Sequence, residues 1–199
     1  MRRVKVVLLL FSLAAGLGHG AVMKTLDLDQ LTEESDTIVH GRIVAARVEW
    51  NRPHTSILTL YTVEADRYWK GFLGASFELA EPGGEVDGLV MHVPGAPRFR
   101  VGEEVVLFVW TDDVYGRHQA NGYEQGAFRV RKDPESGLRW VSRSAPLRAQ
   151  TQAGEVAAER AGLEGAGGQR TARELGQFLA QVSQAVERVS MLSKREVRQ

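Results

Sequence analysis

The uninterrupted apolar run Val105-Val106-Leu107-Phe108-Val109-Trp110 lies near the middle of this 199-residue chain. Six residues is the length of a strand, and apolar side chains at successive positions are typical of a strand buried on both faces. The turn sequence Val101-Gly102-Glu103-Glu104 comes directly before it. We therefore expect this run to form the central buried strand of the core.

Short β-like segments surround this run, and turn residues bound each of them. They span residues 37–50, 56–69, 75–80, 88–93, 115–123, 126–131 and 138–142. Gly41 inside the first segment predicts a bulge, and the segment 56–69 has apolar residues on both faces. No helical pattern alternates with these segments. The spacing predicts a mainly β fold, an antiparallel barrel or sandwich over residues 21–143.

A helical pattern flanks the predicted barrel at each end. Asp27 and Gln30 have the spacing of a capping box at the start of a short helix. Near the C-terminus, residues 171–174 match the same pattern, and apolar residues then recur at helical spacing: Leu175, Phe178, Leu179, Val182, Val186, Val189 and Leu192. We expect this amphipathic helix, in the region 171–199, to cover the second face of the strand 56–69. The alternative is a helix that serves dimerisation or a partner.

Residues 144–170 are rich in Ala, Gly, Gln and Glu and include Gly165-Ala166-Gly167-Gly168. Such a composition buries little apolar surface, so we interpret this segment as a linker between the barrel and the C-terminal helix. The interpretation places the end of the core near residue 143.

The first 20 residues have the three parts of a secretory signal peptide. Arg2, Arg3 and Lys5 form a basic start, an apolar run of about ten residues follows, and small residues end the segment. The run is too short for a spanning helix, which needs roughly 20 residues. We predict cleavage after Gly20, or alternatively after Gly16, and export to the periplasm or the medium. The other reading is an uncleaved N-terminal anchor.

Composition narrows the classes of function. The chain contains no cysteine, so it has neither disulfides nor a lipid-attachment cysteine. Without Arg2, Arg3 and Lys5 it has 22 basic and 25 acidic residues, a net charge of −3. A nucleic-acid binder needs a basic surface, so we expect no nucleic-acid partner. No second apolar segment has spanning length, so we expect no stable membrane span after signal cleavage.

Six motifs stand out between the first predicted helix and the strand 126–131. They are Ser35-Asp36-Thr37-Ile38-Val39-His40-Gly41-Arg42-Ile43, Trp69-Lys70-Gly71, Pro82-Gly83-Gly84-Glu85, Val93-Pro94-Gly95-Ala96-Pro97-Arg98-Phe99, Val101-Gly102-Glu103-Glu104-Val105-Val106-Leu107-Phe108 and Gln125-Gly126-Ala127-Phe128-Arg129-Val130. Together they resemble a family of uncharacterised exported bacterial proteins. The resemblance covers roughly residues 26–131 and implies no activity.

The same layout is distantly similar to the netrin-like module of the tissue inhibitors of metalloproteinases. There too a strand that starts Asp-Ile/Val-Val leads into a strand ending in a Lys-Gly turn, and a Gly-Glu turn precedes an apolar strand. The similarity implies a five-stranded OB-like barrel with terminal helices. Those inhibitors chelate zinc through an N-terminal cysteine, which this chain lacks, so only the fold and protein binding are implied.

Catalytic and metal-binding patterns are not evident. His40, His54, His92 and His118 have no metal-ligand spacing, and no serine lies in a GxSxG turn. The neighbouring carboxylates Glu33-Glu34, Glu103-Glu104 and Asp112-Asp113 are interpreted as solvated turn charges, because adjacent strand residues point to opposite faces. We expect no catalytic residue, no metal site and no cofactor.

The segment 81–100 is the strongest candidate for a binding surface. It is long for a connection, contains four glycines and three prolines, and holds apolar Leu89, Val90 and Met91 in its middle. The candidate contact residues are Gly83, Gly84, Glu85, Arg98 and Arg100. The first hypothesis is an exported non-enzymatic module that binds, through this segment, an extracellular or periplasmic protein or another envelope component, without indicating which ligand or partner. The alternatives are a hydrolase-type enzyme with scattered polar residues, and a structural envelope protein that associates through its C-terminal helix.

Overall fold

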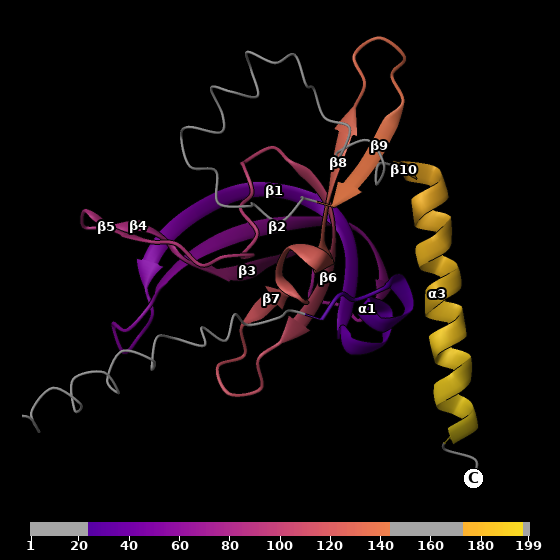
Figure 1. Ribbon diagram of the computed structural model, residues 1–199, viewed down its shortest axis with the longest axis horizontal. Helices are drawn as coiled ribbons and strands as arrows, with labels where there is room; N and C mark the ends of the chain where they lie inside the picture. The colour runs from indigo at the N-terminus through magenta and orange to yellow at the C-terminus, as the bar shows by residue number, and fades with distance from the viewer. Residues whose placement is uncertain (1–23, 144–172, 197–199) are drawn as a thin grey trace, which may run out of the picture.

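The computed structural model describes residues 24–143 and 173–196. The predicted signal peptide 1–20 and the predicted linker 144–170 lie outside these ranges. Within them, the chain forms a closed five-stranded β-barrel with one helix near each end (Figure 1). The prediction of a mainly β, OB-like barrel flanked by two helices is confirmed.

Five strands form the barrel, in the cyclic order β1-β2-β3-β7-β6. Antiparallel pairing of β1 with β6 and a parallel contact between β3 and β7 close the circuit. Their bounds are β1 Thr37–Trp50, β2 Ile57–Lys70, β3 Ser76–Pro82, β6 Glu104–Thr111 and β7 His118–Ala120.

β1 is shared between two halves of the barrel, and this requires it to coil. β1 pairs with β2 from Ile38 to Trp50, while its first residues, Thr37–Arg42, pair with β6. The register shifts at Gly41, as the glycine in the sequence predicted, and an added Cβ there would collide with the carbonyl oxygen of Glu64. Glycine therefore lets the two strands approach closely where β1 bends.

β6 is the central strand, as the apolar run predicted. Val105 to Val109 are all buried. Val105, Leu107 and Val109 face the barrel interior, whereas Val106 and Phe108 belong to a second apolar cluster outside it. Both faces of β6 are thus covered, which explains the absence of polar alternation in its sequence.

The sheet continues beyond the barrel from the first half of β6. β8 (Ala127–Lys132) pairs with β6, β9 (Arg139–Arg143) with β8, and the two-residue β10 (Arg173–Glu174) with β9. A short 3-10 turn, η2 (Tyr123–Gly126), precedes β8.

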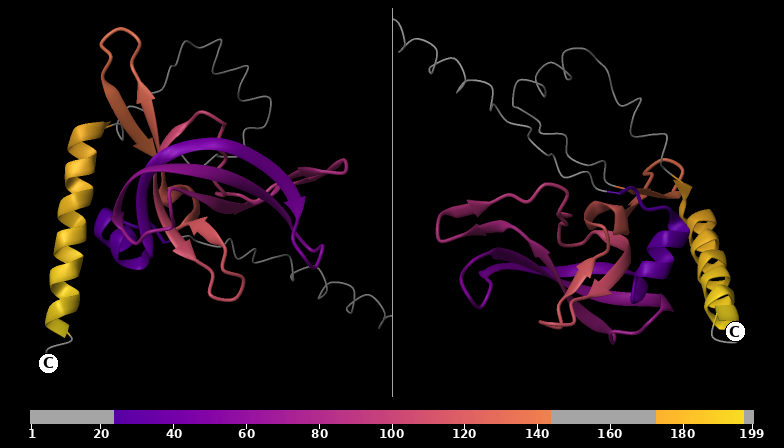
Figure 2. Two further views of the ribbon diagram at one scale, coloured as in Figure 1. Left: turned by 180° about the vertical axis from the view of Figure 1, so that it is seen from behind. Right: turned by 60° about the horizontal axis from the view of Figure 1, so that its bottom comes forward.

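Both helices lie on the outside of this sheet. α1 (Leu28–Glu34) begins with the predicted capping box between Asp27 and Gln30, and Nζ of Lys70 donates to the carbonyl oxygens of Thr32 and Glu33 at its end. α3 (Leu175–Glu196) runs beside α1, on the side of the barrel away from the hairpin of β4 (Gly84–Val86) and β5 (Leu89–Met91) (Figure 2).

α3 docks on the barrel domain, but not where the sequence placed it. Its buried residues Leu175, Phe178 and Val182 pack in the second cluster, which also contains residues of α1, β6, β8 and β9. Leu58 and Leu60, on the outer face of β2, form a separate cluster with Ala80. The expectation that α3 covers this face is wrong, because α1 and the β8–β9 extension provide a larger apolar surface elsewhere.

Three further predictions are corrected. Within the segment 81–100, the predicted strand 88–93 shortens to β5 (Leu89–Met91), and β4 (Gly84–Val86), which was not predicted, pairs with it as a hairpin. The predicted strand 115–123 shrinks to the three residues of β7. The helix begins at Leu175 rather than near 171, because Arg173 and Glu174 pair with β9. The carboxylate of Glu174 then accepts a hydrogen bond from the Gly176 N–H.

Candidate functional site

The base of the β4–β5 hairpin brings three of the predicted contact residues together. Nη1 of Arg98 donates to Oγ1 of Thr59 at 2.9 Å, and that hydroxyl donates to the carbonyl oxygen of Gly83 at 2.7 Å. Gly83 has a φ of 96°, and an added Cβ would collide with the Arg98 guanidinium. Gly84, also in a left-handed conformation, packs against Thr59 and Val48. These residues hold the hairpin on the barrel.

Glu85 and Arg100 are not part of this cluster. Glu85 is exposed on β4, opposite Val90 of β5. The side chain of Arg100 is exposed, and its backbone N–H donates to Oε2 of Glu103 in the turn before β6. Among the described residues, no hydrogen bond or ion pair joins either side chain to Arg98. The five predicted residues therefore divide between a structural base and two exposed positions.

The tip of the hairpin exposes two aliphatic side chains. Leu89 is 56% exposed and Val90 is 73% exposed. Asp87 ties this tip to the end of β1, because its carboxylate accepts a 3.3 Å hydrogen bond from Nε1 of Trp50. The Trp50 ring in turn stacks on His54 of the β1–β2 turn. We call the surface formed by Trp50, His54, Asp87, Leu89 and Val90 the hairpin surface.

Glu81, directly before this hairpin, is a buried carboxyl group that the sequence analysis did not single out. Its side chain is 1% exposed, and Oε1 accepts a 2.8 Å hydrogen bond from the Ala120 N–H of β7. Oε2 has no hydrogen-bond partner among the described residues. Burial raises the pKa of Glu81 to about 8, although the Ala120 N–H and the charge of Arg98 oppose the shift. The sequence did contain a signal for this burial. Phe77, Leu79 and Glu81 alternate along β3, so all three side chains face the inside of the barrel.

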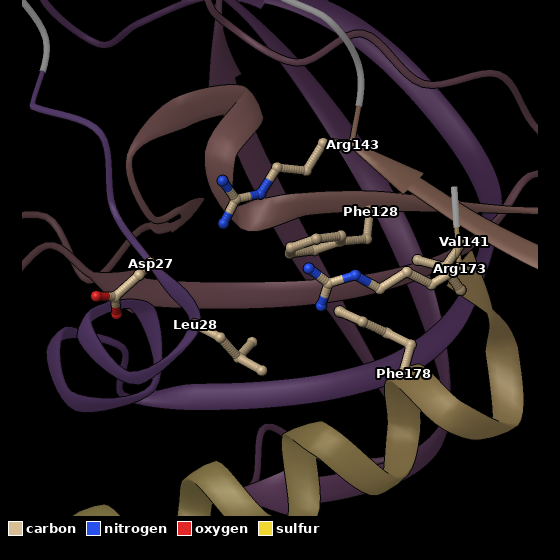
Figure 3. A pocket seen from close by; sticks show the side chains of 7 residues that line it. All are labelled: Asp27, Leu28, Phe128, Val141, Arg143, Arg173 and Phe178. Atoms are coloured by element: carbon tan, nitrogen blue, oxygen red, sulfur yellow. The ribbon is translucent and has the colours of Figure 1, made fainter. Parts of the chain in front are cut away.

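A cavity of about 220 Å³ lies between α1, the β8–β9 hairpin and the start of α3. Phe128, Phe178, Val141 and Leu28 supply its apolar lining, and Asp27, Arg143 and Arg173 supply the polar groups (Figure 3). The sequence could not have indicated it, because residues from both ends of the described domain meet there.

A more open groove of about 460 Å³ lies on the outer side of β2 and β3. Leu58, Leu60 and Ala80 form its floor, and the loop between β6 and β7, with Tyr115 and Arg117, borders it. The Arg117 guanidinium lies 5.2 Å from the centre of the Tyr115 ring. Among its lining residues, no buried polar group points into this groove, so the groove does not indicate a particular class of ligand.

His40 and His118 make structural contacts between strands. Nε2 of His40 lies 2.6 Å from Oε1 of Glu104, and Nη2 of Arg139 donates to the same oxygen at 2.7 Å, which joins β1, β6 and β9. Nδ1 of His118 lies 3.0 Å from Oγ1 of Thr111, and burial lowers the pKa of His118. Within residues 24–143 and 173–196, no group of three or more His, Asp or Glu side chains is arranged to hold a metal ion.

Comparison with known proteins yields no relative: no protein-family model matches the chain, and no curated protein matches it. Neither helix of the described part of the chain is long and apolar enough to cross a membrane.

Proposed function

We propose that this chain is an exported, non-enzymatic binding module that contacts a protein partner through the hairpin surface. The exposure of Leu89 and Val90 carries the proposal. Isolated exposed aliphatic residues are ordinary, but two adjacent ones at the tip of a projecting hairpin, beside a tryptophan, have the composition of an interface anchor.

The construction of the hairpin supports this role. The bonds among Thr59, Gly83 and Arg98 fix its base, and the bond between Trp50 and Asp87 fixes its tip. A loop that is already ordered loses less conformational entropy when it binds. Glu85 and Asp87 add two acidic groups beside the apolar tip. The complementary partner surface is an apolar pocket with a basic rim.

Export is part of the proposal and depends on the N-terminal pattern of residues 1–20. Cleavage should place the mature N-terminus between Gly16 and Val22. N-terminal sequencing of the protein from the producing cells tests this, and recovery of Met1 from the cell envelope would contradict it.

The binding proposal is tested with two matched double variants. Leu89→Ser with Val90→Ser alters the hairpin tip, and Met191→Ser with Leu192→Ser alters an equally exposed aliphatic pair on α3. Each variant is used to capture proteins from the exported fraction of the producing cells. A photo-crosslinking residue at position 90 identifies the direct contact, with position 135 in the β8–β9 turn as its control.

The hairpin variant should lose the partner, the helix variant should retain it, and the crosslink should form at position 90 alone. Both variants should keep the parental melting temperature, since the altered side chains are exposed. Loss only in the helix variant would instead support association through α3. Retention in both variants would refute the proposal.

A further inference from the structure

We propose that the cavity between α1, β8–β9 and α3 is a second binding site, specific for a small amphipathic carboxylate. The apolar body of this ligand would lie on Phe128 and Phe178, and its carboxylate between Arg143 and Arg173. This site lies away from the hairpin surface and does not depend on the protein-binding proposal.

The apolar part of the lining is a pair of packed aromatic rings. The centres of Phe128 and Phe178 are 4.6 Å apart, and Val141 and Leu28 complete the apolar wall (Figure 3). An apolar cavity of roughly 150 Å³ accommodates benzene. A cavity of about 220 Å³ therefore accommodates an apolar body of about ten non-hydrogen atoms or fewer.

The polar part of the lining has two positive charges. Arg143 is positioned by the carbonyl oxygen of Leu26, to which its Nη2 donates at 3.1 Å, and by the Phe128 ring 5.0 Å away. Nη1 of Arg173 donates to Oε1 of Gln181 at 2.6 Å. Neither guanidinium forms an ion pair with a carboxylate of residues 24–143 or 173–196, so both retain donors for a ligand.

The two arginines are close enough to repel each other. Burial lowers the pKa of Arg143, and the charge of Arg173 lowers it further, whereas the charge of Asp27 opposes the shift. An anion between them would relieve this repulsion and accept charge-assisted hydrogen bonds from both. The register between β9 and β10 brings the two arginines together, because Arg173 pairs with Val141, which lies two residues before Arg143 on β9.

Asp27 is the acidic residue of the lining; its charge acts on Arg143, but among the described residues it forms no ion pair with either arginine. Its Oδ1 accepts a 2.9 Å hydrogen bond from the Gln30 N–H and caps α1. In Figure 3 it lies beyond Leu28, at the end of the cavity away from Phe178. The charge of the lining therefore remains positive where the aromatic rings are, and this combination selects an anion with an apolar body over a neutral or cationic one.

Octanoate and 1-octanol provide a matched pair of probes, because they share chain length and differ in charge. Calorimetric titration of the purified protein should give octanoate a Kd of about 1 mM or tighter. The Kd of 1-octanol should be at least about fivefold weaker. Backbone amide signals of residues 141 and 178 should shift in NMR spectra, and those of residues 89 and 90 should not.

Arg173→Gln should weaken octanoate binding at least about fivefold and leave 1-octanol unchanged. Arg131→Gln, an exposed arginine of β8 outside the cavity, is the matched control and should change neither. Arg173 is also exposed, so both variants should keep the parental melting temperature. The hairpin double variant should bind octanoate normally, which separates this site from the proposed function.

Three outcomes would overturn the proposal. The first is that octanoate fails to saturate the protein below about 10 mM. The second is that octanoate and 1-octanol bind with equal Kd. The third is that Arg173→Gln and Arg131→Gln change the Kd of octanoate to the same extent.

Discussion

The indole nitrogen of Trp69 donates a 2.8 Å hydrogen bond to Oγ of Ser183, a residue 114 positions further along the chain. The bond joins the end of β2 to the middle of α3, at the border of the second apolar cluster. It gives the docked helix a fixed position along its own axis, which apolar packing alone specifies poorly.

Ser183→Ala should therefore lower the free energy of unfolding by about 1 kcal/mol, because it removes the acceptor and leaves a half-buried indole N–H unpaired. Urea unfolding measures the loss. Ser190→Ala, on the exposed face of the same helix, should cost less than about 0.5 kcal/mol. Equal losses would show that the bond contributes nothing.

A charge placed on either face of α3 tests the docking itself. Val182 is fully buried and Ser190 is exposed, so Val182→Asp buries an unpaired carboxylate and Ser190→Asp does not. We expect the first to cost about 3 kcal/mol or more and the second less than about 0.5 kcal/mol in urea unfolding. If α3 served only a partner and not the core, the two midpoints would coincide.

Phe108→Ala tests the central strand. The ring is fully buried and lies 5.6 Å from the ring of Phe128, so its removal leaves a cavity under α3. The expected cost is about 3–5 kcal/mol. Phe72→Ala deletes a ring that is 74% exposed and should cost less than about 1 kcal/mol. A melting temperature that does not change in Phe108→Ala would refute the central position of β6.

The buried Glu81 predicts an unusual dependence of stability on pH. Its pKa is about 8 in the folded protein, against an ordinary value of 4.5. As pH rises from 4.5 to 8, the unfolded chain releases this proton and the folded protein retains it, so stability falls. The full loss approaches about 4–5 kcal/mol above pH 8. Below pH 4.5 the group is protonated in both states and the loss is absent.

Glu81→Gln should remove this dependence while keeping an acceptor for the Ala120 N–H. The stability of the variant relative to the parent should therefore increase between pH 5 and pH 8, measured by urea unfolding at each pH. Glu64→Gln, exposed on β2, is the control and should follow the parent. Parallel curves for Glu81→Gln and the parent would refute an uncharged Glu81.

Much of the barrel could be predicted from local pattern. β1 matches its predicted range, the register shift at Gly41 was anticipated, and Val105 to Val109 of the apolar run are buried, although Trp110 at its end is 37% exposed. These features depend on short-range alternation and on glycine, which the sequence displays directly. Of the β4–β5 hairpin, the segment 88–93 anticipated β5, but β4 and the pairing were not predicted, because both strands are three residues long and Gly and Pro punctuate the segment around them.

Features set by distant partners could not be predicted. Arg173 and Glu174 follow a helical pattern, yet they pair with β9, a contact that no local signal shows. The cavity between α1, β8–β9 and α3 forms only because Asp27, Phe128 and Arg173 meet there, and nothing in their separation along the chain indicates this. The predicted contact residues around Arg98 lie at the base of the hairpin, whereas the side chains exposed at its tip are Leu89 and Val90.

The barrel has one narrow seam. β3 and β7 are joined through a single residue pair, Leu79 with His118, and the Glu81 carboxyl group bridges the same two strands by holding the Ala120 N–H. β1 and β2, in contrast, pair through 12 residue pairs, from Ile38 with Lys70 to Trp50 with Ile57. Local opening occurs where backbone pairing is sparsest. The amide protons of β3 and β7 should thus exchange with deuterium sooner than those of β1, and solvent should reach the barrel interior through this seam.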